Sequence, residues 1–211
     1  MADSNPIRDI IRGRLSAERF ETGGVVSDDE LRELIEDAIL APSSFNIQHW
    51  RFVAVRDPED KKRLRAAAYD QAVVEDAAMT LIVLGDVRGH EKLAEILEDC
   101  VENEAMTARA AKRWVELSDV IYRDEQMARD EAIRSATLAS MVLMLSATAR
   151  GLASAPLIGF DPDAVRREFE IPEHCLPVML LAIGRPADDA PRHKVRMPVD
   201  RVLAFDRARN F

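Results

Sequence analysis

The segment from Ala41 to Trp50, A-P-S-S-F-N-I-Q-H-W, gathers neutral hydrogen-bonding side chains in one loop. Ser43 and Ser44 supply hydroxyls, and Asn46 and Gln48 supply amides. Such donors and acceptors suit a heteroaromatic ring whose edge carries N–H and C=O groups. The same residue types are common in a plain loop with Asx-type turns, so the segment alone leaves both interpretations open.

Three further segments could contact a ligand. Arg12, Arg14 and Ser16 lie just past a short helical pattern, and guanidinium groups bind phosphate oxygens bidentately. Residues 192–198, R-H-K-V-R-M-P, form a basic cluster in an otherwise acidic chain and are a candidate anion site. Gly159 follows an apolar run and would let the backbone approach a ligand closely. A solvated helix end, a solvated tail and a simple turn are the respective alternatives.

Several catalytic motifs are absent from the sequence. It has no G-x-G-x-x-G fingerprint after a strand, no P-loop and no nucleophile elbow. The four histidines show no zinc spacing, so we predict no metal site. A protein of this kind can still catalyse if it holds a cofactor that does the chemistry.

Helices and short apolar strands alternate along the chain. Capping and periodicity signals predict helices at 6–14, 28–41, 57–68, 124–150 and 162–169, and strands at 50–55, 79–84 and 178–183. Residues 89–113 are helical and charged, which indicates a mostly solvated segment. Residues 136–149 are apolar or small on nearly every side, which predicts a buried helix.

Length and composition fit one domain or an obligate dimer built from it. The chain has 211 residues, a net charge of -9 and a sequence pI of about 5.1, which disfavours nucleic acid as a partner. Cys100 and Cys175 are far apart, and the first ten residues show no apolar signal region. The apolar stretches around 81–84 and 138–145 are too short or interrupted to span a bilayer. We therefore expect a cytoplasmic protein that binds neither membrane nor nucleic acid.

The ordered segments resemble the nitroreductase family of flavoproteins over nearly the whole chain, from about Ile7 to Phe205. The opening pattern of the family is matched by R-L-S-A-E-R-F at residues 14–20, and its second block by Ala41 to Trp50. Asp70-Gln71 and Glu75-Asp76-Ala77 make the sequence look closest to the quinone-linked, MhqN-like branch.

The resemblance implies a fold and a reaction. It implies one α+β domain over residues 1–211, with a small mixed sheet flanked by helices and completed by a C-terminal segment exchanged between subunits. Residues 187–211 would be an arm that packs on the partner of an obligate homodimer. The cofactor would be FMN, with NADH or NADPH as co-substrate. Hydride would pass through the flavin to a small-molecule acceptor, a nitroaromatic or a quinone, in ping-pong order, and no side chain would act as the catalyst.

The resemblance also assigns cofactor-binding residues. Arg14, the Leu15 backbone, Ser16, Lys194 and Arg196 would hold the FMN phosphate. Ile158, Gly159 and Asp70 would lie at the flavin ring. From the other subunit, the flavin would be approached by Pro42, Ser43, Ser44, Asn46, Gln48 and Ser135.

Three residues depart from the family pattern. Glu18 stands where a cation is usual, His49 replaces a proline, and Asp70 replaces an amide. A carboxylate near the ring would disfavour reduced anionic flavin. A protein that sequesters or senses flavin without efficient turnover therefore remains an alternative function. A flavin reductase or dehalogenase-like enzyme and a helical interaction protein without cofactor also stay open.

Overall fold

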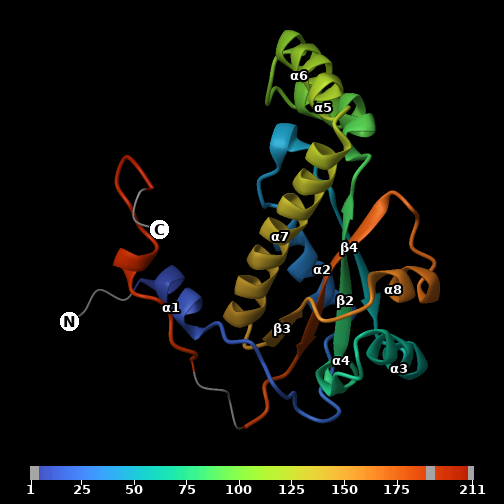
Figure 1. Ribbon diagram of the computed structural model, residues 1–211, viewed down its shortest axis with the longest axis vertical. Helices are drawn as coiled ribbons and strands as arrows, with labels where there is room; N and C mark the ends of the chain where they lie inside the picture. Colours follow the sequence, from blue (N-terminus) through green and yellow to red (C-terminus); the bar gives the residue numbers. More distant parts are fainter. Residues whose placement is uncertain (1–4, 189–192, 209–211) are drawn as a thin grey trace.

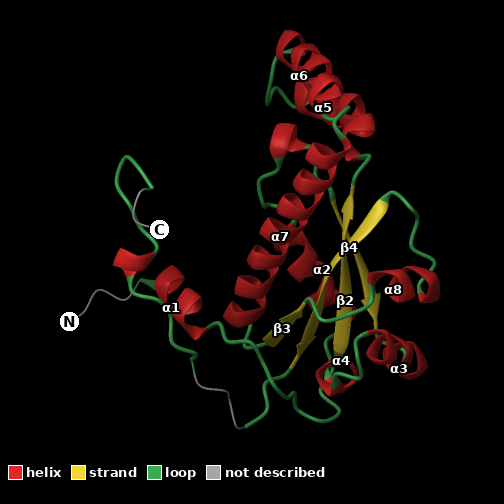
Figure 2. Ribbon diagram, viewed as in Figure 1, coloured by secondary structure: helices red, strands yellow, loops and turns green. Residues whose placement is uncertain are grey.

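The fold is built around one sheet. The computed structural model describes residues 5–188 and 193–208, and its architecture is α+β as predicted (Figure 1 and Figure 2). The strands are β1 (Trp50–Val55), β2 (Met79–Asp86), β3 (Ala153–Leu157) and β4 (Cys175–Gly184). They lie in the order β1-β2-β4-β3, so β1 and β3 form the edges.

The pairing of the strands corrects one expectation. Every pair of neighbouring strands is antiparallel, so the sheet is not mixed within the described residues. Parallel pairing there is limited to an isolated bridge between Ser16 and Ser154. Helices cover both faces of the sheet, so its central strands are mostly apolar, a pattern otherwise typical of parallel strands.

Two layers of helices enclose the sheet. On one face lie α2 (Asp28–Ala38) and α7 (Glu125–Ala149); on the other lie α3 (Pro58–Ala67), α4 (Ala72–Asp76) and α8 (Pro162–Glu168). In β2, Leu81 and Val83 join the core beneath α7, whereas Ile82 and Leu84 join the core beneath α3 and α8. This alternation follows from the period of two in a strand.

The helix α7 packs unusually close to β2. A Cβ at Gly85 would lie 2.8 Å from the carbonyl oxygen of Ala132, so the absence of a side chain lets the two backbones approach. The side chain of Asp124 caps the helix, and Gly151 follows its end with a φ of 72°, which agrees with the predicted helix end.

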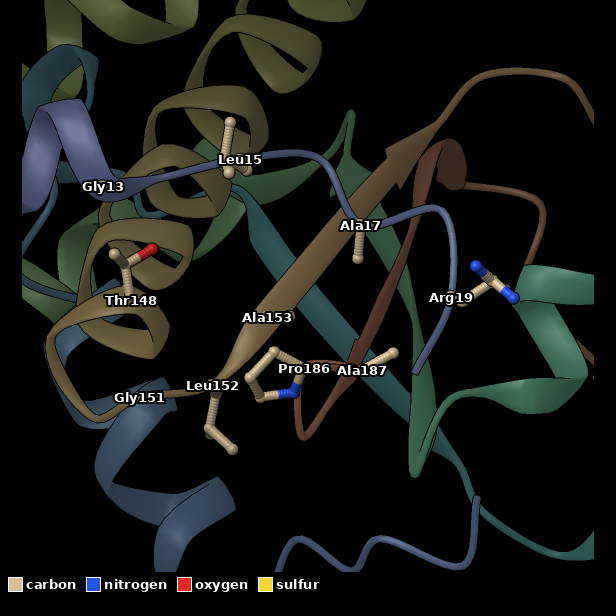
Figure 3. A pocket seen from close by; sticks show the side chains of 10 residues that line it. All are labelled: Gly13, Leu15, Ala17, Arg19, Thr148, Gly151, Leu152, Ala153, Pro186 and Ala187. Atoms are coloured by element: carbon tan, nitrogen blue, oxygen red, sulfur yellow. The ribbon is translucent and has the colours of Figure 1, made fainter. Parts of the chain in front are cut away.

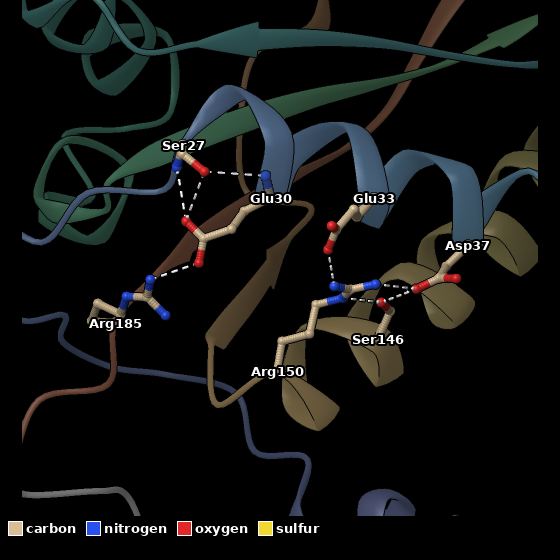
Figure 4. Close-up of polar contacts among 7 residues, drawn as sticks. All are labelled: Ser27, Glu30, Glu33, Asp37, Ser146, Arg150 and Arg185. Atoms are coloured by element: carbon tan, nitrogen blue, oxygen red, sulfur yellow. Dashed lines mark hydrogen bonds and ion pairs between the residues drawn. The ribbon is translucent and has the colours of Figure 1, made fainter.

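Charged residues connect α2 to the elements around it (Figure 4). Ser27 and Glu30 form the predicted capping box, and Glu30 also accepts from Arg185 at 2.6 Å. At the other end, Arg150 pairs with Glu33 and Asp37, and the hydroxyl of Ser146 donates to Asp37.

One side of α7 is uncovered in the single chain. We predicted burial on nearly every side, yet Leu138 and Met141 are exposed. An apolar hollow continues this surface, lined by Ile7, Ile10, Ile11, Asp37, Leu40, Val142, Leu145, Ser146 and Ala149. The physical reason is that only one side of α7 meets the sheet. Within the described chain α7 alone is long and apolar enough to span a membrane, a test that core helices also pass.

The segment expected to be solvated has a core of its own. It forms a 3-10 turn (Gly89–Lys92), α5 (Leu93–Glu102) and α6 (Ala108–Ile121). Leu93 and Leu97 are fully buried against Ile47, Tyr122 and Ala128. The charged residues of this segment are exposed, on α5, on α6 and in the turns beside them, so its composition does not reveal the apolar side.

Both ends of the described chain lie on the same side of the molecule in Figure 1. The helix α1 (Pro6–Gly13) begins at the N-cap Asn5, with Pro6 in its first turn as predicted. Residues 193–208 form an extended tail with one 3-10 turn (Val199–Arg201), on the same side of the molecule as α1 (Figure 1). Val195, Met197 and Phe205 of this tail are exposed.

Candidate functional site

The predicted phosphate-binding segment and the loop of residues 42–48 lie at opposite ends of α7. The end of α1 lies at the C-terminal end of α7, where a Cβ at Gly13 would lie 3.6 Å from Thr148 Cγ2. The loop of residues 42–48 lies at the other end, where Ile47 packs against Ala128 (Figure 1). At a rise of about 1.5 Å per residue, these points on α7 are roughly 30 Å apart. One ligand of flavin size cannot contact both groups of the same chain.

Residues 13–20 run beside the edge strand β3. Ser16 bridges Ser154, and the Ala17 N–H donates to the Ser154 carbonyl at 2.9 Å. Side chains alternate along such an extended segment. One side lines a cavity of about 210 Å³ (Figure 3), formed by Gly13, Leu15, Ala17, Arg19, Thr148, Gly151, Leu152, Ala153, Pro186 and Ala187.

The side of residues 13–20 that faces away from this cavity carries the predicted phosphate ligands Arg14 and Ser16. Arg14 Nη1 donates to Ser16 Oγ at 3.5 Å. Lys194 Nζ lies 3.6 Å from Glu18 Oε1, and Arg196 Nη1 donates to the Lys194 carbonyl at 3.0 Å. Residues far apart in sequence thus form a cationic surface that also contains the Glu18 carboxylate. Arg192 lies outside the described residues.

A second cluster forms where β3 ends. Gln71 Nε2 donates to the carbonyls of Gly159 at 2.5 Å and Ala68 at 2.9 Å, which ties the α3–α4 turn to the loop after β3. Ile158 is 85% exposed, so the loop presents itself to solvent. No sequence pattern indicates this role of Gln71, because its partners are backbone carbonyls that only the fold brings near.

Asp70 differs from the isolated charge that the sequence suggests. Its carboxylate lies 2.7 Å from Arg65 Nε, and Arg65 Nη1 also lies 3.1 Å from Glu75 Oε2. The contact with Asp70 raises the pKa of Arg65 above its ordinary value, with Glu75 adding to the rise. The negative charge that we expected at the ring is therefore paired.

The loop of residues 42–48 has an unusual backbone. Phe45, Asn46 and Gln48 all have positive φ, at 52°, 60° and 57°. The Ser43 hydroxyl accepts from the Gln48 N–H at 2.9 Å and so stabilises the turn. Burial raises the pKa of Tyr122, and a hydrogen bond with Ser44 opposes that rise. Non-glycine residues held in this conformation are often found at ligand sites.

The predicted contacts Pro42, Asn46 and Ser135 have different outcomes. Pro42 and Asn46 are exposed, and Asn46 Nδ2 lies 3.9 Å from Cys100 Sγ. Ser135 is fully buried, and its hydroxyl donates to Glu131 at 3.1 Å. A side chain with no accessible surface cannot reach a ligand of another subunit. We therefore remove Ser135 from the candidate ligand-binding residues, because its own chain covers it.

His49 is a structural residue of this chain. It is fully buried, with Nδ1 2.8 Å from the carbonyl oxygen of Asp86. Burial lowers its pKa, so the ring is neutral and Nδ1 is the donor. Gly89 leaves it room, since a Cβ there would lie 3.0 Å from His49 Nδ1.

A set of possible metal ligands lies beside His49, whose Nδ1 contacts the Asp86 carbonyl. Side-chain ligand atoms of Asp86, His174 and Cys175 lie within 4.8 Å of one another, because β2 and β4 pair Asp86 with Cys175. The Asp86 carboxylate already accepts from Arg51 at 3.1 Å and from the Arg88 N–H at 3.0 Å. The charge of Arg51 balances that of Asp86, which disfavours a divalent cation. The prediction that no metal binds stays a prediction.

Comparison with known proteins identifies one family. A family model described as the nitroreductase family matches residues 11–185. The Bacillus subtilis protein MhqN, which carries the name of an NAD(P)H nitroreductase, is 35% identical over 199 residues, 93% of this chain and 97% of that protein. A protein of Thermus thermophilus named NADH dehydrogenase is 36% identical over 182 residues, 85% of this chain and 86% of that protein.

Solved structures agree with these relatives. A nitroreductase of Exiguobacterium sibiricum in complex with FMN superposes with a TM-score of 0.88 at 30% identity, covering 96% of this chain and 98% of that chain. A Bacillus subtilis nitroreductase, ydfN, also has a TM-score of 0.88, at 34% identity, covering 94% of this chain and 97% of that chain.

Proposed function

This chain belongs to the nitroreductase family and is an NAD(P)H oxidoreductase with FMN as its cofactor, and we propose that it delivers electrons to small nitroaromatic or quinone acceptors. One observation carries the location of the site. The cationic surface of Arg14, Lys194 and Arg196 lies where Ser16 bridges Ser154 of β3. The Gln71–Gly159 cluster lies just past the end of the same strand. Ile158 lies four positions after Ser154, a distance of about 13 Å along an extended chain. That spacing suits a phosphate at one end and a flavin ring at the other.

The side chains present fit such a cofactor. Arg14 and Lys194 offer positive charge and Ser16 a hydroxyl, the donor set that a phosphate dianion requires. The exposed loop at Ile158 and Gly159 brings backbone close to the place of the ring. Leu15 would contribute backbone, and Arg196 would add charge from the tail.

The protein acts by binding and orientation. FMN, when bound, supplies the acceptance and release of hydride. Arg14 and Lys194 offset the phosphate charge, and backbone N–H groups at Ile158 and Gly159 are the donors that we assign to the ring edge. Gln71 holds that edge in place through the Gly159 carbonyl. NAD(P)H and the acceptor would occupy the same exposed position in turn, which is the ping-pong order.

We propose an obligate homodimer in a cytoplasmic setting. Pro42, Ser43, Ser44, Asn46 and Gln48 lie at the end of α7 remote from the phosphate group of their own chain, so in the proposal they complete the site of the partner. The uncovered apolar side of α7 supplies an interface. The exposed apolar residues of the tail fit an arm, over residues 187–211, that packs on the partner and is exchanged with it.

Anaerobic stopped-flow spectroscopy tests the function. We expect NADH or NADPH to bleach the visible absorbance of bound FMN, and a quinone or nitroaromatic to restore it. Arg14→Gln should weaken FMN binding, whereas the matched variant Arg8→Gln, on the exposed side of α1, should not. Bound flavin that neither nucleotide reduces would contradict the proposal and indicate a sequestering or sensing protein instead.

A further inference from the structure

Two consecutive residues before α4 have a costly backbone conformation. Tyr69 and Asp70 have φ values of 53° and 59°, in the left-handed region. For residues other than glycine this conformation is strained. It persists only where neighbouring groups hold it, so the contacts of this turn identify what fixes Asp70.

Arg65 makes most of those contacts. Its carbonyl accepts from the Asp70 N–H at 3.0 Å, and its Nε lies 2.7 Å from Asp70 Oδ1. Its Nη1 lies 3.1 Å from Glu75 on α4, which fixes the guanidinium from the other side. The side chain of Arg65 is 31% exposed and that of Asp70 is 81% exposed. Arg65 thus lies behind Asp70 and presents the carboxylate outward.

We propose that Arg65 is a positioning residue that holds Asp70 at the flavin and balances its charge, and thereby sets the reduction potential of the bound FMN. The inference rests on the proposed function, in which the Gln71–Gly159 cluster lies at the ring, since Asp70 directly precedes Gln71 in the chain. Reduction adds negative charge to the flavin, and a bare carboxylate beside it opposes that charge. The guanidinium at 2.7 Å offsets the carboxylate, so the enzyme keeps an acid at this position without lowering the potential.

A double-mutant cycle on the FMN-loaded protein tests this role. The midpoint potential is measured by spectroelectrochemical titration for wild type, Arg65→Gln, Asp70→Asn and the double variant. Asn tolerates the left-handed conformation, so Asp70→Asn removes charge with little change of backbone. We expect Arg65→Gln to weaken binding of reduced relative to oxidised FMN roughly tenfold, a fall of about 30 mV for a two-electron couple.

The cycle separates charge from structure. We expect Asp70→Asn to raise the potential, the double variant to lie near wild type because both charges are gone, and Arg65→Lys to keep a potential near that of wild type. Arg63→Gln, on the same helix α3 and paired with Asp60, is the matched control and should change nothing.

Three outcomes would overturn the inference. One is a potential of the double variant as low as that of Arg65→Gln; another is no shift in any variant. If Arg65→Gln does not fold, the Asp70→Asn variant alone decides. The inference is refuted if that variant leaves the potential unchanged or lowers it. Wild-type protein that binds no FMN would instead overturn the proposed function, and this inference with it.

Discussion

Replacing Glu18 by Gln should tighten FMN binding by a factor of about two to five. In the structure Lys194 Nζ lies 3.6 Å from the Glu18 carboxylate. A phosphate bound between Arg14 and Lys194 must compete with this carboxylate for the ammonium group. The substitution removes the competitor and keeps a side chain of nearly the same size.

The size of the effect follows from the distance and the exposure. Two unit charges at this separation attract each other by about 1 kcal/mol in water. The two side chains are 80% and 67% exposed, and exposed pairs contribute about 0.2–1 kcal/mol in practice. Loss of the repulsion between Glu18 and the phosphate adds to the gain in affinity. Salt reduces this gain by screening the charges, with a Debye length of about 10 Å at about 0.1 M.

Titration of apoprotein with FMN, followed by flavin fluorescence, measures the change. Riboflavin, which lacks the phosphate, is the internal control, because its affinity should be the same for wild type and Glu18→Gln. Glu21→Gln is the matched variant, three residues away and also exposed. An unchanged or weaker FMN affinity in Glu18→Gln at low salt would refute the reasoning, as would an equal gain for riboflavin.

Three further predictions concern stability and assembly. Gly85→Ala forces a methyl group to 2.8 Å from the Ala132 carbonyl, and should lower the free energy of unfolding by about 1–3 kcal/mol in urea titrations; a neutral effect would contradict the close packing of α7 on β2. Ser146 and Arg150 lower the pKa of Asp37, so its contribution is present above pH 3.8 and lost as the pH falls further. Urea unfolding should show less acid destabilisation in Ser146→Ala than in wild type, and equal slopes would refute that linkage. Leu138→Glu should give a monomer without FMN in size-exclusion chromatography with light scattering, whereas a flavin-bearing dimer would exclude α7 from the interface.

Local signals explain which parts of the fold can be predicted. The β1 strand has the predicted bounds, because aromatic and β-branched residues lie between a loop and a helix that Asp57 caps and Pro58 begins. The capping box at Ser27 and Glu30 and the helix end at Gly151 are also confirmed, since each depends on residues only a few positions apart. The sequence does not predict β3, because Pro156 argues against a strand, although an edge position tolerates it.

The arrangement of the site depends on contacts that no local pattern contains. The segment motifs provide most of the candidate residues, but they do not show that Arg14 and Asn46 of one chain lie at opposite ends of α7. Arg65 escapes prediction because its partners, Asp70 and Glu75, are ordinary surface charges in the sequence. Burial of Ser135 likewise follows from packing and not from its own neighbours in the chain.

The length of α7 has a genetic consequence in the proposed homodimer. Each polypeptide would give its phosphate-binding end to one catalytic centre and its 42–48 loop to the other. Two inactive alleles, one damaged at Arg14 and one at Asn46, would then complement each other when expressed together. A mixed pair would contain one centre with both defects and one built only from intact halves, so activity would return although neither gene product is active alone.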